Sequence, residues 1–332
     1  MRYKSCTHIE NSMNFGDKSL TFCCSGNKGR PVLFAYHGED YPAERIEEKR
    51  RELIQQLADN TCPLCHGCPE LQFRDWPERD GRLKTLVLNH FRECTLDCCY
   101  CGIGSTENQK KWRQRTDKYR FLPVLEEIRR QDLLDPQAVF HWGGGEPTIT
   151  KDFKEIVTIL MDLRLRQLIN TNATVYSPAL EEALRRGLVT CQVSIDSGTP
   201  ETYARIKGRN LHAKVWRHVR QYAAGGTDLI VKYILMDGNN TEGEVTAFVR
   251  NCMDGGVKSI HIAANDRDLQ ADAISGQTLK AAALLQVLAQ RAGIRATVMA
   301  GYFQKYTSHV HALAASLARA MAGGKTVKLP MA

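Results

Sequence analysis

The chain has 332 residues, of which 43% are hydrophobic, and carries a formal charge of +8. This size suits one large α/β domain with a smaller addition. No apolar run approaches the ~20 residues of a membrane-spanning helix, and the first residues, MRYKSCTHIENSMN, lack the apolar core of a secretory signal. We therefore expect a cytoplasmic protein with no membrane partner.

Residues 1–82 are predicted to form a cysteine-rich first region. A short apolar stretch at 31–36 predicts a strand. The segment from Pro42 to Leu57 predicts a helix with proline near its start and a charged outer face. The charged stretch 73–82, which contains Pro77 and Gly81, predicts a linker between this region and residue 83.

The chain contains 12 cysteines, many at short spacings. In a chain without a secretory signal, this clustering favours metal binding over disulfides. Two overlapping C-x2-C pairs are typical of a metal site, because a tight turn brings two thiolates to one centre. We expect either zinc or an auxiliary iron–sulfur cluster, and the alternative is unligated structural cysteines. The candidate ligands are Cys6, Cys23, Cys24, Cys62, Cys65 and Cys68.

From residue 83 onward, strand-like and helix-like segments alternate. Strands are predicted at Thr85–Asn89, Ala138–Trp142, Gln167–Asn170, Thr190–Ile195, Leu229–Leu235, Ser259–Ala263 and Ala296–Met299. Helices are predicted at Phe121–Arg130, Phe153–Arg164, Pro178–Arg186, Ala213–Tyr222, Glu242–Met253, Leu279–Ala292 and His309–Met321. The alternation predicts βα units around a parallel sheet. Six or seven such units suit a partial (β/α)6-type barrel over 83–305, followed by a C-terminal helix and tail at 306–332.

The first strand of this series leads into a cysteine loop. Cys94, Cys98 and Cys101 follow a C-x3-C-x2-C spacing. Three thiolates this close suit one soft metal centre, such as a four-iron cluster. Three ligands leave one iron open, and an open iron at a strand end indicates substrate or cofactor chemistry. In parallel βα folds, chemistry lies at the carboxyl ends of the strands.

Glycines follow the second strand in the segment Gly143-Gly144-Gly145-Glu146-Pro147. Consecutive glycines let the backbone approach a ligand closely, and Glu146 is a candidate acceptor for an ammonium group. The alternative is a plain glycine-rich turn. No Gly-Lys-Ser/Thr comes after this segment, which excludes a phosphate-binding P-loop.

Polar residues end the next two strands. Asn172 is a candidate pocket residue, or it caps a turn. Alternation along a strand sends the side chains of Ser194 and Asp196 to the same side. Asp196 alternatively caps the helix that begins near Pro200.

Together, these motifs resemble the radical S-adenosylmethionine (SAM) superfamily. The cysteine spacing and Tyr100, the aromatic residue before the third cysteine, match its cluster signature. The segment Gly144–Pro147 resembles its GGEP motif, and Ser194 with Asp196 resembles its Ser-x-Asp segment. The resemblance covers about residues 84–265. It implies a four-iron cluster on the three loop cysteines and SAM on the open iron. One electron then cleaves SAM to a 5′-deoxyadenosyl radical, which abstracts a substrate hydrogen atom.

The resemblance also implies roles for single residues. Gly144, Gly145, Glu146 and Pro147 would contact the amino group of SAM, and Ser194 its carboxylate or ribose. Asp196 would serve SAM or the substrate. A further contact to the SAM carboxylate is left open among Arg205, Lys207 and Arg209. The cysteine-rich first region is similar to the SPASM and twitch extensions that hold auxiliary clusters.

We predict a radical SAM enzyme, an oxidoreductase or maturase acting on a peptide or a small molecule. A second cluster would favour oxidation or cross-linking, whereas zinc or no metal would favour a redox-neutral reaction. The basic charge favours solubility, and it also suits an acidic electron donor such as a flavodoxin or ferredoxin. One alternative is an iron–sulfur electron-transfer protein without SAM cleavage. Another is a zinc-stabilised nucleic-acid-binding protein, which the lack of a basic run interleaved with aromatics disfavours.

Overall fold

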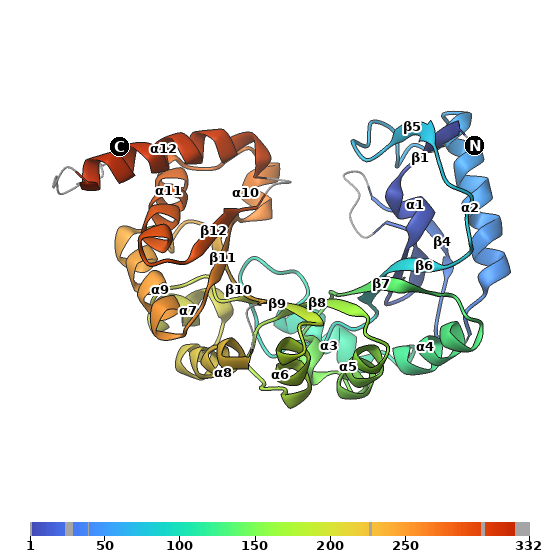
Figure 1. The fold of residues 1–332 in the computed structure, drawn as a ribbon, viewed down its shortest axis with the longest axis horizontal. Helices are drawn as coiled ribbons and strands as arrows, with labels where there is room; N and C mark the ends of the chain where they lie inside the picture. Colours follow the sequence, from blue (N-terminus) through green and yellow to red (C-terminus); the bar gives the residue numbers. More distant parts are fainter. Residues whose placement is uncertain (1, 24–28, 39, 226–227, 300–302, 323–332) are drawn as a thin grey trace. The chain divides into compact units, whose positions relative to one another are not determined.

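The computed structural model describes residues 2–23, 29–38, 40–225, 228–299 and 303–322. The chain divides into two compact units (Figure 1). The first unit contains Met1–Cys94 and Glu107–Ile169, and the second contains Thr95–Thr106 and Asn170–Ala332. Among the described residues, no helix combines the length and apolarity needed to cross a membrane.

The first unit contains a mixed sheet. In spatial order its strands are β8 (Arg166–Thr171), β7 (Leu134–Trp142), β6 (Leu83–Asn89), β2 (Ser12–Gly16), β3 (Ser19–Thr21) and β4 (Val32–Ala35). The pairs from β8 to β2 are parallel, and β3 and β4 join antiparallel. A separate antiparallel pair is formed by β1 (Arg2–Ser5) and β5 (Gln72–Asp75).

The N-terminal region therefore contributes strands to the same sheet as β6. The register of β2 on β6 runs from Ser12 opposite Thr85 to Gly16 opposite Asn89. On β2, Met13 and Phe15 are fully buried, and because they are two residues apart on a strand they point to the same face of the sheet. The segment predicted as a linker is in part the strand β5, so that prediction is wrong for residues 73–75. The domain boundary at 82 stays a prediction.

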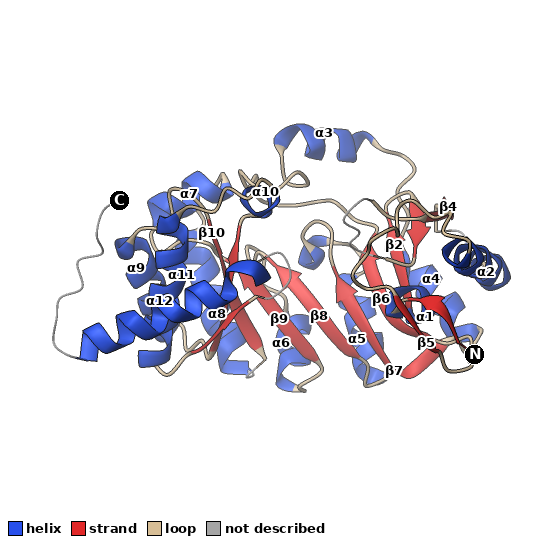
Figure 2. Cartoon of the chain, turned by 90° about the horizontal axis from the view of Figure 1, so that it is seen from above, coloured by secondary structure: helices blue, strands red, loops and turns tan. Residues whose placement is uncertain are grey.

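Helices of the first unit cover the parallel strands. They are α1 (Thr7–Asn11), α2 (Ala43–Ala58), α3 (Thr106–Gln114), α4 (Phe121–Arg130), the 3-10 helix η1 (Pro147–Ile149) and α5 (Phe153–Asp162). Both views show α4 and α5 on one side of β6 and β7 (Figures 1 and 2). Phe121 of α4 is fully buried, and its ring lies 4.8 Å from that of Phe15 on β2. Each such side chain contributes about 1.5–3 kcal/mol when it leaves water.

The second unit repeats the strand–helix pattern. Its parallel strands are, in order, β9 (Val189–Ser194), β10 (Leu229–Leu235), β11 (Ser259–Ala264) and β12 (Arg295–Val298). Its helices are α6 (Pro178–Arg185), α7 (Pro200–Lys207), α8 (His212–Gly225), α9 (Glu242–Asp254), α10 (Asp266–Gln270), α11 (Gly276–Arg291) and α12 (Gln304–Ala322). The C-terminal helix α12 runs beside α11 (Figure 1).

Hydroxyl side chains set the starts of these helices. Ser177, Thr199, Thr241 and Ser275 each accept a hydrogen bond from the backbone N–H three residues later. This N-capping satisfies one of the four N–H groups that a helix start leaves unpaired. Since Thr199 caps α7, the alternative role predicted for Asp196 as the cap of this helix is wrong.

The predicted α/β class and the alternation of strands and helices from residue 83 are confirmed. The observed β10 and α4 have the predicted bounds, and the other ends differ by a few residues. Among the described residues, the elements outside the repeat that were not predicted include β1, α1, β2, β3, β5 and α3, because each is short or carries few apolar residues.

Candidate functional site

The candidate site is built on the cysteine loop, which we define as residues 90–105, between β6 and α3. Its first part, residues 90–94, belongs to the first unit and contains Cys94. Its second part, residues 95–105, belongs to the second unit and contains Cys98 and Cys101. Each part is held by its own set of contacts.

In the first unit, the glycines after β7 pack against the backbone of the loop. The N–H of Gly145 donates to the carbonyl of Phe91 at 3.2 Å, and that of Glu146 donates to the carbonyl of Glu93 at 2.6 Å. A Cβ atom on Gly144 would lie 2.4 Å from the Phe91 oxygen, and one on Gly145 would lie 2.0 Å from the Glu93 oxygen. Glycine is therefore required here by the loop backbone itself. The contact also places Glu146 beside the residue that precedes Cys94.

The side chain of Glu146 is buried, with 1% of its surface exposed. One carboxylate oxygen accepts from both the N–H and the hydroxyl of Thr148, at 3.2 and 2.7 Å. Glu146 thus caps η1, in which Pro147 is the first residue. A buried carboxylate in a fixed orientation suits recognition of a cationic group, because burial strengthens an ionic contact.

Helix α3 holds the loop backbone around Cys94. The side-chain oxygen of Gln109 accepts from the N–H of Cys94 at 3.1 Å, and its amide nitrogen donates to the carbonyl of Arg92 at 2.6 Å. Gln109 is buried. The side chain of Gln109 therefore fixes both the N–H of Cys94 and the carbonyl of Arg92.

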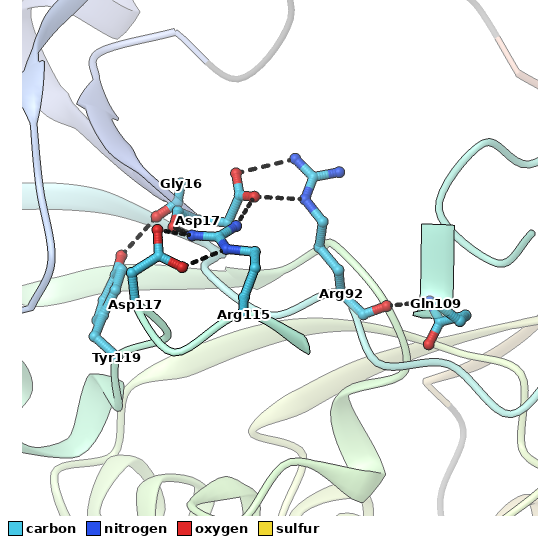
Figure 3. Close-up of polar contacts among 7 residues, drawn as sticks. All are labelled: Gly16, Asp17, Arg92, Gln109, Arg115, Asp117 and Tyr119. Atoms are coloured by element: carbon cyan, nitrogen blue, oxygen red, sulfur yellow. Dashed lines mark hydrogen bonds and ion pairs between the residues drawn. The ribbon is translucent and has the colours of Figure 1, made fainter. Parts of the chain in front are cut away.

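A second set of contacts ties the same segment to the turn after β2 (Figure 3). Asp17 accepts from Arg92 at 3.1 Å and from Arg115 at 2.7 Å. Arg115 also pairs with Asp117, and Tyr119 donates to the carbonyl of Gly16 at 2.8 Å. Burial alone would raise the pKa of Asp17, but the two guanidinium groups outweigh it and lower the pKa.

In the second unit, the loop rests on the C-terminal end of α7. The N–H of Asp97 donates to the carbonyl of Lys207 at 3.1 Å, and that of Cys99 donates to the carbonyl of Ile206 at 2.9 Å. These carbonyls lack partners within their own helix. Gly208 follows with φ +72°, and a Cβ there would lie 2.7 Å from the carbonyl oxygen of Asp97. The carbonyl groups at the end of α7 therefore hold residues 97–99 by hydrogen bonds to their backbone.

A buried charged network lies next to Cys98 and Cys101. Lys207, 1% exposed, forms an ion pair with Asp196, which is fully buried. The hydroxyl of Tyr100 donates to Asp196 at 2.6 Å and accepts from Lys207 at 2.8 Å. Burial alone would lower the pKa of Lys207, but Asp196 and the two cysteine sulfurs raise it. The lysine therefore stays charged.

Asp196 also joins strands β9 and β10. Its other oxygen accepts from the N–H of Ile234 at 2.7 Å, and its carbonyl accepts from Asn239 at 2.9 Å. Asp196 adopts φ +62°, outside β9, which ends at Ser194. Its orientation thus follows from the left-handed backbone and not from strand alternation. Ser194 is half-buried at the strand end, opposite Lys232 of β10.

Asn172 performs the turn-capping role that the sequence left open. Its side-chain oxygen accepts from the N–H and hydroxyl of Thr174 at 2.9 and 2.7 Å. Its amide nitrogen donates to the hydroxyl of Thr95, in the cysteine loop, at 3.1 Å. Ala173 between them adopts φ +53°, a conformation that favours glycine.

Among the three basic candidates near α7, the structure separates Lys207 from the others. Its ammonium group is engaged by Asp196 and Tyr100, whereas Arg205 and Arg209 are exposed. Arg205 donates to Thr202 at 3.3 Å and to the carbonyl of Gly238. The buried position of Lys207 argues against a direct role in binding a ligand carboxylate.

The cysteines of the first region also come together. A pocket in the first unit is lined by Cys6, Cys23, Cys65 and Cys68 together with apolar side chains such as Phe22. Cys62 contacts the thiol of Cys65. Cys24 lies outside the described residues. Four of the six predicted ligands thus line one pocket, and a fifth, Cys62, contacts one of them. The exposed His66 is not part of the lining.

Without a metal, the thiols of Cys6 and Cys65 are held neutral. Burial raises the pKa of Cys6, and burial and the neighbouring Cys62 raise the pKa of Cys65 to about 12. None of the cysteines at this pocket is in a disulfide. A set of sulfur donors in an apolar pocket fits a soft metal centre, which would lower these pKa values.

The three loop cysteines are likewise not in disulfides and are half-buried. Among the described residues, no three cysteine, histidine, aspartate or glutamate side chains have the geometry for a single metal ion. A four-iron cluster, however, takes one thiolate per iron. Three cysteine sulfurs are the donor type that such a cluster requires.

Several residues that shape the site were not predicted from the sequence. Asp17, Arg92, Gln109 and Arg115 carry no motif, and their spacing in the sequence does not reveal that they meet. Lys207 differs from these four residues, because the sequence already made it a candidate for the contact to the SAM carboxylate. Cys191 and Cys252 are fully buried and belong to the core.

Comparison with known proteins assigns a family to this region. Residues 88–249, about half of the chain, match the family model described as "Radical SAM superfamily". A GTP 3′,8-cyclase 1 of Mycobacterium tuberculosis is 32% identical over 169 residues, which cover 48% of this chain and 45% of that protein. An AdoMet-dependent heme synthase of Methanosarcina barkeri is 31% identical over 117 residues, covering 35% of this chain and 32% of that protein. The chain spans about half the length of the first curated relatives, or less.

Among solved structures, SuiB of Streptococcus suis bound to S-adenosylmethionine has a TM-score of 0.51 and 16% sequence identity. The match covers 80% of this chain and 58% of that chain. At this identity the likeness concerns the fold, and it agrees with the parallel βα architecture. The predicted fold class, a partial barrel of βα units, is confirmed.

Proposed function

This chain belongs to the radical SAM superfamily, and from this premise we propose that it is an enzyme that cleaves SAM reductively and abstracts a hydrogen atom from an organic substrate. The contact of Glu146 with Glu93, next to Cys94, carries the proposal. It brings the GGEP segment of one strand end directly onto the cysteine loop of another. The match to the radical SAM family model and the buried carboxylate of Glu146 favour SAM binding over an electron-transfer protein without SAM chemistry.

Each group of site residues would have its own task. Cys94, Cys98 and Cys101 would hold the four-iron cluster, which when bound supplies the electron that cleaves SAM into methionine and a 5′-deoxyadenosyl radical. Gly144 to Pro147 would bind the SAM amino group, with the buried carboxylate of Glu146 as its acceptor. Ser194 would contact the SAM carboxylate or ribose. Asn172 and Asp196 would act by fixing the loop, through Thr95 and Tyr100.

Cluster content tests this assignment, with an adjacent cysteine as a matched control. Cys98→Ala should lose the loop cluster's share of the reconstituted iron and sulfide, together with that cluster's electron paramagnetic resonance signal on reduction. Cys99→Ala should keep both, because Cys99 is exposed and contributes to the loop through its backbone N–H. Equal iron content in the two variants would contradict the ligand assignment.

We further propose that the pocket around Cys6, Cys23, Cys62, Cys65 and Cys68 holds a second metal centre, an auxiliary iron–sulfur cluster or zinc. The convergence of sulfur donors supports it. In a variant with Cys94, Cys98 and Cys101 changed to alanine, iron or zinc should remain bound. Adding Cys62→Ala and Cys65→Ala should remove it. A triple variant that binds neither metal after reconstitution would contradict the proposal.

The identity of the second metal bears on the reaction. A cluster that accepts an electron would favour oxidation or cross-linking of the substrate, whereas zinc would favour a redox-neutral outcome. The relatives are named for different reactions, a GTP cyclisation and a heme synthesis. We therefore propose the reaction class, hydrogen abstraction from a peptide or small molecule, and assign no single substrate.

We also propose an acidic electron donor of the flavodoxin or ferredoxin type, and the cytoplasm as location. Helix α3, which holds the loop backbone at Cys94, exposes Lys110, Lys111 and Arg113. A basic helix at the cluster loop suits an acidic partner, since complementary charge speeds the encounter.

A further inference from the structure

A contribution to folding stability does not by itself explain why the ion pair of Lys207 and Asp196 is buried beside the cysteine loop. The pair is buried, with side chains 2% and 0% exposed. A buried ion pair is often no more stabilising than apolar residues of the same volume. Its position is unusual, because Tyr100, which bridges both charges, lies directly before Cys101.

Lys207 is linked to the cysteine loop in two ways. Its carbonyl accepts from the N–H of Asp97, and its ammonium group donates to the hydroxyl of Tyr100 at 2.8 Å. The loop between these points contains Cys98. Lys207 therefore fixes the loop from both sides of one cluster ligand and carries a full positive charge at the same place.

A fixed charge in a buried region acts strongly on a redox group. Adding an electron to a cluster is easier beside a cation and harder beside an anion, and the low local dielectric enlarges both effects. Charge and hydrogen bonding near the sulfurs are known means by which proteins set cluster potentials. Here, the two opposite charges of one ion pair lie next to two ligand cysteines.

We propose that Lys207 and Asp196 are positioning residues that set the reduction potential of the cluster held by Cys98 and Cys101, with Lys207 raising it and Asp196 lowering it. The inference rests on the proposed function, because it requires a cluster on the loop. It also gives Lys207 a role other than the contact to the SAM carboxylate, which the sequence left open among Arg205, Lys207 and Arg209.

The test is a potentiometric titration of the reconstituted full chain, followed by electron paramagnetic resonance. Lys207→Met should shift the midpoint potential to more negative values, since it removes the cation and leaves the carboxylate. Asp196→Asn should shift it to more positive values. Shifts of opposite sign indicate an electrostatic effect. A loosened loop would instead shift the midpoint potential of both variants in the same direction, or lower the iron content of both.

Two controls complete the experiment. Lys214→Met removes an exposed charge on α8 in the same unit and should leave the potential unchanged. Lys207→Arg keeps the charge and should stay nearer the wild-type potential than Lys207→Met. If Lys207→Met does not fold, Asp196→Asn carries the test alone through its positive shift.

Three outcomes are decisive against the inference or its premise. Shifts of the same sign in the two variants, or no shift at full iron content, would overturn the electrostatic role. If Lys207→Met does not fold, a negative shift or no shift of the midpoint potential in Asp196→Asn would overturn the electrostatic role. A wild-type chain that takes up no iron on the loop would instead overturn the proposed function on which the inference rests.

Discussion

Three consecutive glycines, Gly143 to Gly145, lie where the backbone of the cysteine loop passes the end of β7. The sequence explains them by the approach of a ligand, whereas the structure shows a nearer cause. The carbonyl oxygens of Phe91 and Glu93 occupy the space that a Cβ atom on Gly144 or Gly145 would need. The motif therefore acts first on the loop that carries Cys94.

Substituting Gly145 should therefore damage the loop more than a glycine-to-alanine change normally does. In Gly145→Ala the new Cβ would lie 2.0 Å from the Glu93 oxygen, so the backbone must move, at a cost of about 1–3 kcal/mol. We expect a lower midpoint of thermal unfolding and a lower iron content after reconstitution. Gly243→Ala on α9 is the control, since no heavy atom lies within 4 Å of its Cβ position. Similar behaviour of the two variants would contradict this account.

At the scale of elements, the turn after β2 and helix α3 act together on the loop. Asp17 in the turn holds Arg92, and Gln109 of α3 holds the backbone of Cys94 and Arg92. These contacts join an N-terminal hairpin to a helix that is about 90 residues later in the chain. The N-terminal region is thus part of the support for the site.

Asp17→Asn should destabilise the first unit at neutral pH. The asparagine cannot pair with two guanidinium groups, and leaving them without their carboxylate costs about 1–3 kcal/mol, with the lower value favoured because Arg92 is 42% exposed. The pKa of Asp17 in the folded chain is lowered from 3.8, so its contribution is present above 3.8. It is lost as the pH falls through the folded pKa.

The measurement is chemical unfolding of the metal-free wild type and Asp17→Asn between neutral pH and about pH 3. The stability difference should be largest near neutrality and should shrink below pH 3.8. A difference that stays constant over this range would show that the carboxylate charge has no role. Asp132→Asn, which affects an exposed ion pair with Arg82, is a control for which we expect a small effect throughout.

At the scale of the whole molecule, the role that we propose for the excess positive charge is to attract an acidic electron donor. The exposed lysines and arginine of α3 belong to the helix that holds the loop at Cys94. Reversing two of them, in Lys110→Glu with Arg113→Glu, should slow reduction by a flavodoxin roughly tenfold at low salt. The effect should fade at high salt, where surface charges are screened.

Reduction by dithionite, which needs no docking protein, should be unchanged in the same variant. Lys214→Glu on α8 provides a charge change away from α3 and should have little effect with either reductant. If the α3 variant is slowed equally with dithionite and flavodoxin, the charge reversal acts on the loop itself and the docking proposal fails.

Much of the parallel sheet could be predicted from the sequence, because each strand is an apolar run followed by a helix with apolar spacing. The candidate ligand cysteines could be proposed for a similar reason, since all three lie within residues 94–101. β2 and α3 escaped prediction because Ser12–Gly16 is short and Thr106–Gln114 is almost wholly polar. Their roles depend on contacts with the loop that no local pattern encodes.

The site residues show the same division. The sequence marks Asp196 and Lys207 as candidates, but not that they neutralise each other in the interior. Local pattern also placed Asp196 by strand alternation, whereas its positive φ turns it out of the strand. Burial and backbone conformation depend on the tertiary fold and therefore lay beyond prediction from local sequence.

The most direct measurement of the central claim is 5′-deoxyadenosine formation by the anaerobically reconstituted and reduced chain in the presence of SAM. The account predicts that the wild type and Cys99→Ala form the product and that Cys98→Ala forms none. A wild-type chain that holds a reducible cluster but neither binds nor cleaves SAM would contradict it and would favour a simple electron-transfer protein.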